Sequence, residues 1–218
     1  MSFLSKITVN LKRVKRALYF LKKNYWNPQT DRYGAMGEGS YISLPATIDY
    51  SPNIYLGKNV RIKPHCVLLT VGEGKLIMGN DIDVAVGLTV VSSNHRQKPG
   101  VVRDGSNDDN DYTDVVVEDD VWIGANVTLL AGSHVGRGAI IGAGCVVRRQ
   151  HIPPYSVVIG NPAKVIRFKF TPEEIIEHEK AVYPEDKRLL EDIIRKNYEE
   201  FFLTKRDEIK KYRSLNSF

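Results

Sequence analysis

Five histidines are the side chains of this sequence best suited to acid–base chemistry, and they lie far apart along the chain. They are His65, His95, His134, His151 and His178. An imidazole has a pKa of about 6.5, so at neutral pH it can take a proton from a hydroxyl or amine that attacks a substrate. A zinc site built from three histidines needs a closely spaced pair, and this sequence contains none.

Two other groups of residues have the chemistry of metal ligands but are better explained without a metal. Cys66 and Cys145 occupy positions where the repeat described below needs small apolar side chains, so we expect two buried thiols. An acidic segment lacks the ligand spacing and the terminal Glu of an EF-hand loop, which favours a solvated loop. Its members are Asp104, Asp108, Asp109, Asp111 and Asp114.

A six-residue repeat predicts the elements that position these side chains. In the C-terminal half an aliphatic residue leads most units, and a small or branched residue follows four positions later. The leads there are Val117, Ile123, Leu129, Val135, Ile141, Val147, Ile159 and Val165. A period of six matches neither one helix nor one strand, and it is typical of a solenoid whose coils bury their faces on one another.

The same repeat runs through the N-terminal half. Its leads are Leu44, Tyr50, Leu56, Ile62 and Leu68, then Met78, Val84 and Val90 after a short interruption at Val71–Leu76. Taking three units to a triangular coil predicts about five coils, stacked about 4.8 Å apart. The main interruption, Arg96–Asp114, is rich in Gly, Asp and Asn and lacks apolar leads. We therefore expect a protruding loop, and loops on rigid scaffolds often carry function.

Three segments follow from these patterns: a basic N-terminal helical segment at residues 1–40, a β-helix at 41–168 with its loop at 96–114, and a C-terminal helical extension at 169–218. Thr171–Glu174 reads as a capping box with proline at the first helical position. Pro184 interrupts the helical pattern, which resumes from Glu185 to about Phe202.

Composition is that of an ordinary soluble domain: 218 residues, 42% hydrophobic and 26% charged. No stretch approaches the roughly 20 apolar residues of a membrane span, and no signal-peptide core is present, so we expect a cytoplasmic protein. A net charge of +5 without a nucleic-acid-binding motif predicts no nucleic-acid partner. Residues 1–26 form a basic amphipathic pattern that either covers the first coil or contacts an anionic membrane surface peripherally.

The run VWIGANVTLLAGSHVGRGAIIGAGCVVRRQHIPPYSVVIGNPAKVIR, from Val121 to Arg167, resembles the hexapeptide-repeat acyltransferases. It is most similar to the branch of maltose and galactoside O-acetyltransferases, polysaccharide O-acetyltransferases and xenobiotic acetyltransferases. The resemblance covers about residues 44–174, and Asn161–Lys164 is its most specific part. It implies a mainly β fold that is a left-handed parallel β-helix, acetyl-CoA as co-substrate with no bound cofactor or metal, and a homotrimer with active sites between subunits.

The resemblance also implies roles for single residues. His95, directly before the main interruption, matches the family's catalytic histidine and is expected to be the general base. His65, Asn94 and Trp122 match positions near the acceptor, although a solvated corner explains His65 equally well and a subunit interface explains Trp122. The three remaining histidines receive no role, since two fall in expected corners of the repeat and one in the helical tail.

Coenzyme A is long and polyanionic, so its site needs a groove, backbone donors and cations. By resemblance, small residues line the pantetheine groove and basic residues meet the phosphates. The groove residues are Gly124, Ala125, Gly142 and Ala143, and the basic ones are Arg148, Lys164 and Arg167. One extra residue before Ile152 departs from the family pattern and leaves the role of Arg148 open.

These expectations predict an acetyl-CoA-dependent O-acetyltransferase that acts on a hydroxyl of a sugar, polysaccharide unit or hydroxylated small molecule. N-acetylation of an amino sugar or sugar nucleotide is the alternative with the same base. A γ-type carbonic anhydrase would need the missing histidine pair, and a non-catalytic solenoid would not bind acetyl-CoA. No pattern in the sequence identifies the acceptor.

Overall fold

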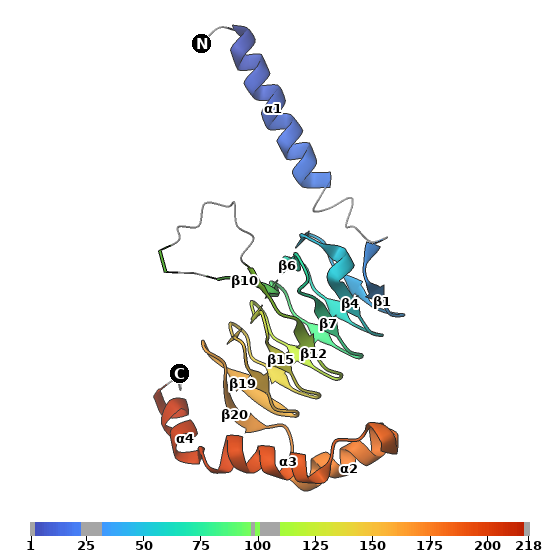
Figure 1. Cartoon of the computed structure of the whole chain (residues 1–218), viewed down its shortest axis with the longest axis vertical. Helices are drawn as coiled ribbons and strands as arrows, with labels where there is room; N and C mark the ends of the chain where they lie inside the picture. Colours follow the sequence, from blue (N-terminus) through green and yellow to red (C-terminus); the bar gives the residue numbers. More distant parts are fainter. Residues whose placement is uncertain (1–2, 23–31, 97–98, 101–109, 216–218) are drawn as a thin grey trace.

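A computed structural model describes residues 3–22, 32–96, 99–100 and 110–215 of the chain. Its centre is a parallel β-solenoid with three sheets, which we call faces 1, 2 and 3 in chain order (Figure 1). Each coil crosses face 1, then face 2, then face 3, and the strands of successive coils pair in parallel. The chain therefore turns a corner three times in each coil.

The strands are short and fall in register on the three faces. Face 1 holds β1 (Ala35–Met36), β4 (Ile54–Leu56), β7 (Leu76–Met78), β12 (Val115–Val117), β15 (His134–Val135) and β18 (His151–Ile152). Face 2 holds β2 (Tyr41–Ile42), β5 (Arg61–Ile62), β8 (Asp83–Val84), β13 (Trp122–Ile123), β16 (Ile140–Ile141) and β19 (Ser156–Ile159). Face 3 holds β3 (Ala46–Ile48), β6 (Cys66–Leu69), β9 (Thr89–Val91), β14 (Thr128–Leu130) and β17 (Val146–Val147).

The solenoid has about six turns, one more than the repeat predicted, because β1 and β2 begin a coil before the first predicted lead, Leu44. Ala35, Met36 and Tyr41 in this first coil are exposed. A terminal coil has a neighbour on one side only, so its sequence does not need the buried aliphatic lead that revealed the others. At the other end β20 (Lys164–Phe168) folds back antiparallel on β19.

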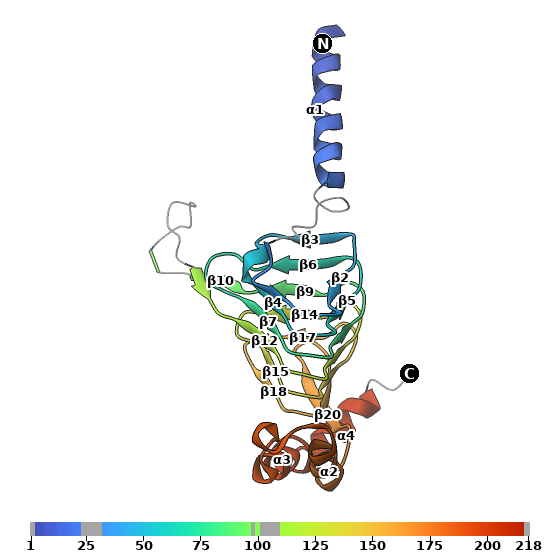
Figure 2. The ribbon, with the colours of Figure 1, turned by 90° about the vertical axis from the view of Figure 1, so that its right-hand side faces the viewer.

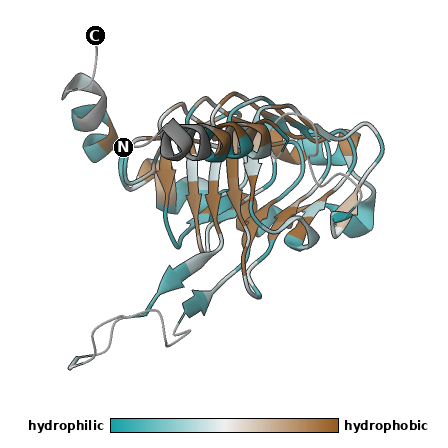
Figure 3. Cartoon of the chain, turned by 90° about the horizontal axis from the view of Figure 1, so that it is seen from above, coloured by the Kyte–Doolittle hydropathy of each residue, from teal (hydrophilic) through white to brown (hydrophobic). Residues whose placement is uncertain are grey.

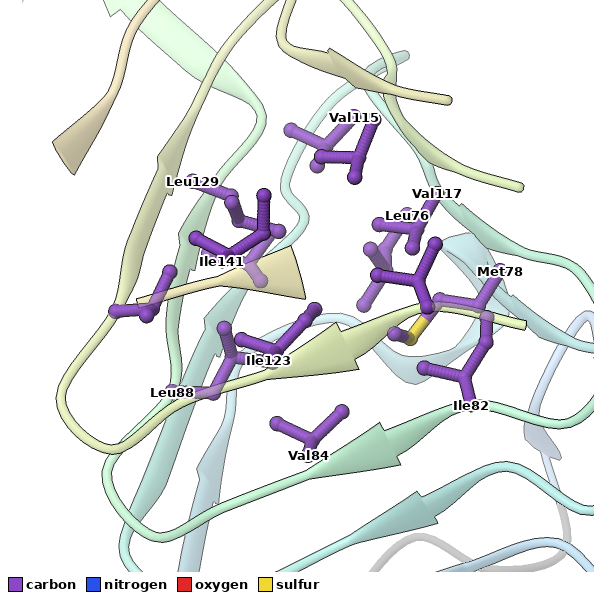
Figure 4. Packing of buried hydrophobic residues seen from close by; sticks show 14 of the residues in the cluster. Leu76, Met78, Ile82, Val84, Leu88, Val115, Val117, Ile123, Leu129 and Ile141 are labelled. Carbon is purple, nitrogen blue, oxygen red and sulfur yellow. The ribbon is translucent and has the colours of Figure 1, made fainter. Parts of the chain in front are cut away.

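The leading and fifth positions of the repeat form one continuous core inside the coils. Ile62, Leu68, Ile123 and Leu129 are fully buried, and Figure 4 shows such side chains meeting from all three faces. Figure 3 shows apolar residues concentrated along the strands of the coils. Leu44, Ile159 and Val165 are half-buried leads. Tyr50 is exposed at 48%, because it precedes a short 3-10 turn, η3 (Ser51–Asn53), at a corner.

The C-terminal extension lies beneath the last coil (Figure 2). It consists of α2 (Pro172–Val182), η4 (Glu185–Lys187), α3 (Glu191–Tyr198), the π-helical η5 (Glu199–Leu203) and α4 (Arg206–Leu215). The capping box is confirmed: the Thr171 side chain accepts from the backbone N–H of Glu174, whose carboxylate accepts from Thr171. A second apolar cluster joins the helices to the solenoid and includes Tyr155, Phe168 and Ile175.

Helix α1 (Phe3–Leu21) lies beyond the first coil, in both views of the ribbon (Figures 1 and 2). Every residue from 11 to 22 is exposed, so this part of the helix does not cover the first coil. No helix within the described ranges is long and apolar enough to cross a membrane.

Candidate active site

Both interruptions of the repeat lie at one corner of the solenoid, between faces 3 and 1. The first is the turn between β6 and β7, and the second is a hairpin of β10 (Ser93–His95) and β11 (Asn110–Tyr112) between β9 and β12. They sit on neighbouring coils, because β6 pairs with β9 and β7 pairs with β12. The expected loop thus begins and ends as a hairpin; residues 97–98 and 101–109 within it lie outside the described residues.

His95 and Asn110 face each other across this hairpin. They are cross-strand partners, and His95 Nδ1 lies 2.6 Å from Asn110 Oδ1. The Asn110 side-chain amide donates from Nδ2 to the Tyr112 hydroxyl at 2.9 Å, which directs its oxygen toward the imidazole. An amide oxygen only accepts, so the neutral imidazole donates from Nδ1 and leaves its lone pair on Nε2. His95 is exposed, so Nε2 is available to an incoming group.

The turn between β6 and β7, which is the short interruption of the repeat, packs against the ring of Tyr112. Gly72 has a left-handed φ of 65°, and a Cβ there would overlap the Tyr112 ring. Asn53 fixes this turn, because its Nδ2 donates to the carbonyls of Thr70 at 2.9 Å and Gly72 at 2.8 Å. A glycine is therefore required here both by the backbone conformation and by the ring that packs on it.

Two of the five acidic residues expected in a solvated loop, Asp111 and Asp114, lie at the base of the hairpin and are bonded. The Asp111 carboxylate lies 3.1 Å from Arg149 Nη1 and 3.6 Å from Arg96 Nη2. Asp114 accepts from the backbone N–H of Lys75 at 2.9 Å. The hairpin is thus bonded to Arg149, which follows β17, and to Lys75 in the turn between β6 and β7. Asp104, Asp108 and Asp109 lie outside the described residues.

A second group of predicted site residues lies at the corner between faces 2 and 3. Gly124 and Gly142 occupy equivalent places on successive coils, and the N–H of Gly124 donates to Ile141 at 2.8 Å. A Cβ on Gly124 would lie 2.6 Å from the Ala143 nitrogen, so close stacking of the coils requires this glycine. Ala143 is exposed and Ala125 half-buried. His65 is exposed at the same corner two coils earlier, with a left-handed φ of 66°.

Trp122 lies on face 2 and is 55% exposed. Its register partners are Asp83 and Ile140 on the adjacent coils. Asp83 is itself held by Arg61, whose Nε lies 2.6 Å from the carboxylate. The indole ring therefore lies on an exposed sheet surface.

The predicted cations lie at the last coils. Arg148 follows β17 and is exposed, and Arg167 is exposed on β20. Lys164 Nζ lies 3.4 Å from the Glu208 carboxylate of α4, at a cavity of about 270 Å³ that Phe201, Lys205 and Ile209 also line. The C-terminal extension thus places an acid beside one of the expected phosphate contacts.

His134 and His151 lie in strands β15 and β18 on face 1, which corrects their expected place at corners. Their ring centroids are 4.7 Å apart, and His134 Nε2 lies 2.6 Å from the Glu118 carboxylate. Burial, followed by the nearby His134, lowers the pKa of His151. No cluster of three His, Cys, Asp or Glu suited to a metal ion occurs within the described part of the chain.

The structure separates the candidates: His95 and the groove residues lie at two different corners of the solenoid, Trp122 lies on face 2, and the cations lie at the last coils. Asn94 joins His95 in the hairpin, where its Oδ1 accepts from the His95 backbone N–H at 2.9 Å. The groove residues occupy the other corner. Sequence reasoning missed Asn110 and Tyr112, because the repeat registers only apolar leads; a polar strand such as Asn110–Tyr112 carries no such signal.

The chain is similar in sequence and in fold to known proteins with this architecture. The family of bacterial transferase hexapeptide repeats (six repeats) matches residues 114–149. A Staphylococcus aureus (strain COL) protein, which its name classes provisionally as an acetyltransferase, is 34% identical over 134 residues, covering 58% of this chain and 60% of that protein. The alignment thus spans less than two thirds of that relative's length.

Two solved structures share the fold. A maltose O-acetyltransferase from Clostridium difficile 630 has a TM-score of 0.58 at 27% identity, over 77% of this chain and 89% of that one. A hexapeptide-repeat acetyltransferase from Vibrio cholerae, complexed with acetyl coenzyme A, has a TM-score of 0.57 at 22% identity, over 75% and 90%. The repeat, the solenoid and these similarities confirm the resemblance seen in the sequence: the chain carries the β-solenoid of the hexapeptide-repeat acetyltransferases.

Proposed function

We propose that this protein is an acetyl-CoA-dependent O-acetyltransferase that acts on a hydroxyl of a sugar, a polysaccharide unit or a hydroxylated small molecule. The observation that carries the proposal is the exposed His95 whose Nδ1 is held by Asn110 at 2.6 Å, since this geometry leaves Nε2 to act as a base. Acetyl-CoA is the proposed donor because the chain is similar to acetyltransferases, and one of these was solved in complex with acetyl coenzyme A.

The reaction is a direct transfer with His95 as the general base. Nε2 accepts the hydroxyl proton while the hydroxyl oxygen bonds to the thioester carbonyl carbon, which forms a tetrahedral intermediate. When the intermediate collapses, the carbon–sulfur bond breaks and the proton on Nε2 passes to the departing thiolate. The products are the acetyl ester and free CoA, and His95 returns to its starting tautomer.

The other candidates bind the two substrates. Gly124, Ala125, Gly142 and Ala143 line the pantetheine groove, and Arg148, Lys164 and Arg167 meet the phosphates. His65, Asn94 and Trp122 contact the acceptor or its surroundings. Lys164 must then exchange its contact with Glu208 for phosphate, since the two lie 3.4 Å apart in the structure.

The placement of His95 and of the groove residues at different corners of the solenoid supports a homotrimer. In a three-fold assembly, the corner that carries His95 faces the corner that carries Gly124 on a neighbouring copy, so each site is completed by two chains. Sedimentation equilibrium is expected to give three times the 24.6 kDa of one chain. A monomer that turns over at full rate would contradict this assembly.

The activity is tested by thiol release from acetyl-CoA with a panel of sugars, amino sugars and hydroxylated antibiotics. His95→Ala is expected to bind acetyl-CoA as wild type does, by calorimetry, and to lose about 10²- to 10⁴-fold in turnover. His134→Gln, whose ring lies on face 1 against Glu118, is the matched control and should keep wild-type turnover. Unchanged turnover in His95→Ala would remove His95 as the base.

The linkage in the product separates the two acetylation chemistries. Mild alkali or hydroxylamine removes an O-acetyl ester and leaves an amide intact. Products that all resist this treatment would overturn O-acetylation in favour of N-acetylation of an amino sugar or sugar nucleotide. Failure to bind acetyl-CoA at all would overturn the enzyme proposal.

A further inference from the structure

Helix α1 presents an apolar stripe that nothing in the described chain covers. Leu11, Val14, Leu18 and Leu21 follow one another at spacings of three and four, so they share one face of the helix. Their exposures are 57%, 54%, 59% and 47%. On α2, by contrast, Ile175 and Ile176 are buried against the solenoid. An amphipathic helix with its apolar face in water calls for a partner.

Charge along this end of the chain indicates what the partner is. Residues 1–30 hold seven of the 31 Lys and Arg and none of the 26 Asp and Glu, so the remainder of the chain carries a formal charge of −2. The net charge of +5 thus comes entirely from this segment. On the described part of α1, Lys12, Arg13, Lys15 and Arg16 lie off the apolar stripe and are exposed.

Self-association of α1 is the competing explanation, because a three–four spacing is also that of a coiled-coil seam. The positions that flank the seam decide against it. With Leu11 and Val14 in the seam, Lys15 lies at a flanking position, and Lys12 and Arg13 lie farther round the helix. The helix has no acidic residue to pair with any of them. A coiled coil of identical chains would therefore concentrate positive charge with no acid to offset it, whereas an anionic surface neutralises these basic residues.

We propose that α1 lies in the plane of an anionic phospholipid surface, with its apolar stripe in the acyl boundary and its basic residues against the lipid phosphates. The apolar stripe then leaves water and the basic residues meet opposite charge, which is the arrangement of an interfacial helix. Each basic residue near such a surface strengthens binding about fivefold, and salt weakens that contribution. The helix holds the solenoid at the membrane, independently of the reaction that the solenoid catalyses.

Flotation of the full-length protein with vesicles tests this surface. We expect binding to phosphatidylcholine vesicles that contain 30% phosphatidylglycerol, loss of most binding at high salt, and little binding to phosphatidylcholine alone. Leu18→Asp and Arg16→Glu should each reduce binding to anionic vesicles at least fivefold, through the stripe and the charge respectively. Lys58→Glu, which makes the same charge change at an exposed solenoid turn, is the matched control and should bind as wild type.

Three results would overturn the proposal. The first is equal binding of Arg16→Glu and wild type to anionic vesicles, and the second is equal binding of wild type to both kinds of vesicle. The third is a larger assembly in solution that Leu18→Asp dissociates, which would assign the stripe to a second copy of the chain. An unchanged thermal unfolding midpoint for each variant shows that the solenoid is intact, and acetyl-CoA binding measured separately keeps this test distinct from that of the enzyme activity.

Discussion

His95 and Asn110 are separated by fifteen positions in the sequence and lie 2.6 Å apart, Nδ1 to Oδ1, as cross-strand partners of the β10–β11 hairpin. Tyr112 holds the Asn110 amide, and Gly72 makes room for the Tyr112 ring. The candidate base is therefore oriented by a chain of contacts that starts in one interruption of the repeat and ends in the other.

Asn110 variants test this orientation through the pH–rate profile. Asn110→Asp keeps an acceptor for Nδ1–H but adds a charge that stabilises the imidazolium, so the acidic limb should move to higher pH by about one unit. Asn110→Leu removes the acceptor and should lower turnover about 10- to 100-fold, with acetyl-CoA affinity unchanged. Asn197→Asp adds the same charge on α3, in the C-terminal extension beneath the last coil, and should not change the pH–rate profile. An unmoved acidic limb in Asn110→Asp would show that Asn110 does not orient the base.

Gly72→Ala tests the support beneath Tyr112. The added Cβ would overlap the ring, so Tyr112 must shift and release the Asn110 amide. We expect turnover to fall about tenfold or more. For stability the matched control is Gly144→Ala, which has a similar left-handed φ, 72° against 65°, and nothing within 4 Å of the new Cβ. Equal destabilisation of the two variants in thermal unfolding, together with wild-type turnover of Gly72→Ala, would rule out the contact.

A buried carboxylate fastens the C-terminal helices to the solenoid, which predicts a stability effect. Glu179 is 2% exposed, accepts from the Tyr155 hydroxyl, and lies 3.1 Å from Arg137 Nη1. Burial, and then the contact with Glu179, raise the pKa of Tyr155, so its hydroxyl stays a donor. Glu179→Ala leaves Arg137 without its buried partner and should cost about 3 kcal/mol in unfolding free energy.

The control for Glu179 is Glu177→Ala on the same helix. The side chain of Glu177 is 76% exposed and its partner is Lys180, so its loss should cost less than about 0.5 kcal/mol. Denaturant unfolding measures both variants, and limited proteolysis reports release of the C-terminal helices. Similar midpoints for the two would show that the Glu179 contacts do not hold the extension.

The two cysteines are predicted to be unreactive in the folded protein. Cys66 and Cys145 are 1% and 0% exposed, and burial raises the pKa of the Cys66 thiol to about 11. Labelling by a disulfide reagent at pH 8 should be about 100-fold slower than in guanidinium, because the reactive thiolate is scarce and covered. Rapid labelling of the native protein would contradict the burial.

The same pKa shift sets a direction for stability against pH. In the unfolded chain the Cys66 thiol loses its proton near the ordinary value of 9.0, well before the folded protein does. Unfolding therefore releases a proton as the pH rises above about 9, and stability should fall there. Cys66→Ala should flatten this alkaline fall in the thermal midpoint, and an unchanged slope would mean that other groups cause it.

Much of the fold could be predicted from the sequence, because an aliphatic residue every six positions can be buried only if the chain turns at a constant rate. The leads Ile62, Ile123 and Ile141 are all fully buried as expected. The first coil was not predicted, because Ala35 and Tyr41 lie at a free end of the solenoid, where no buried aliphatic lead is needed. His134 and His151 were misplaced at corners, because polar residues on the outer side of a strand look the same in the repeat as residues at a turn.

The candidate site divides in the same way. The sequence by itself determined the scaffold, the two places where it is interrupted, and His95 as the candidate base at one of them. Only the tertiary structure decided that both interruptions share a corner, that Asn110 orients His95, and that Glu179 meets Tyr155 and Arg137 from 24 and 42 positions away. Buried apolar groups leave a local period that can be read along the chain, whereas a polar pair across a hairpin or between two elements depends on distances that exist only once the chain has folded.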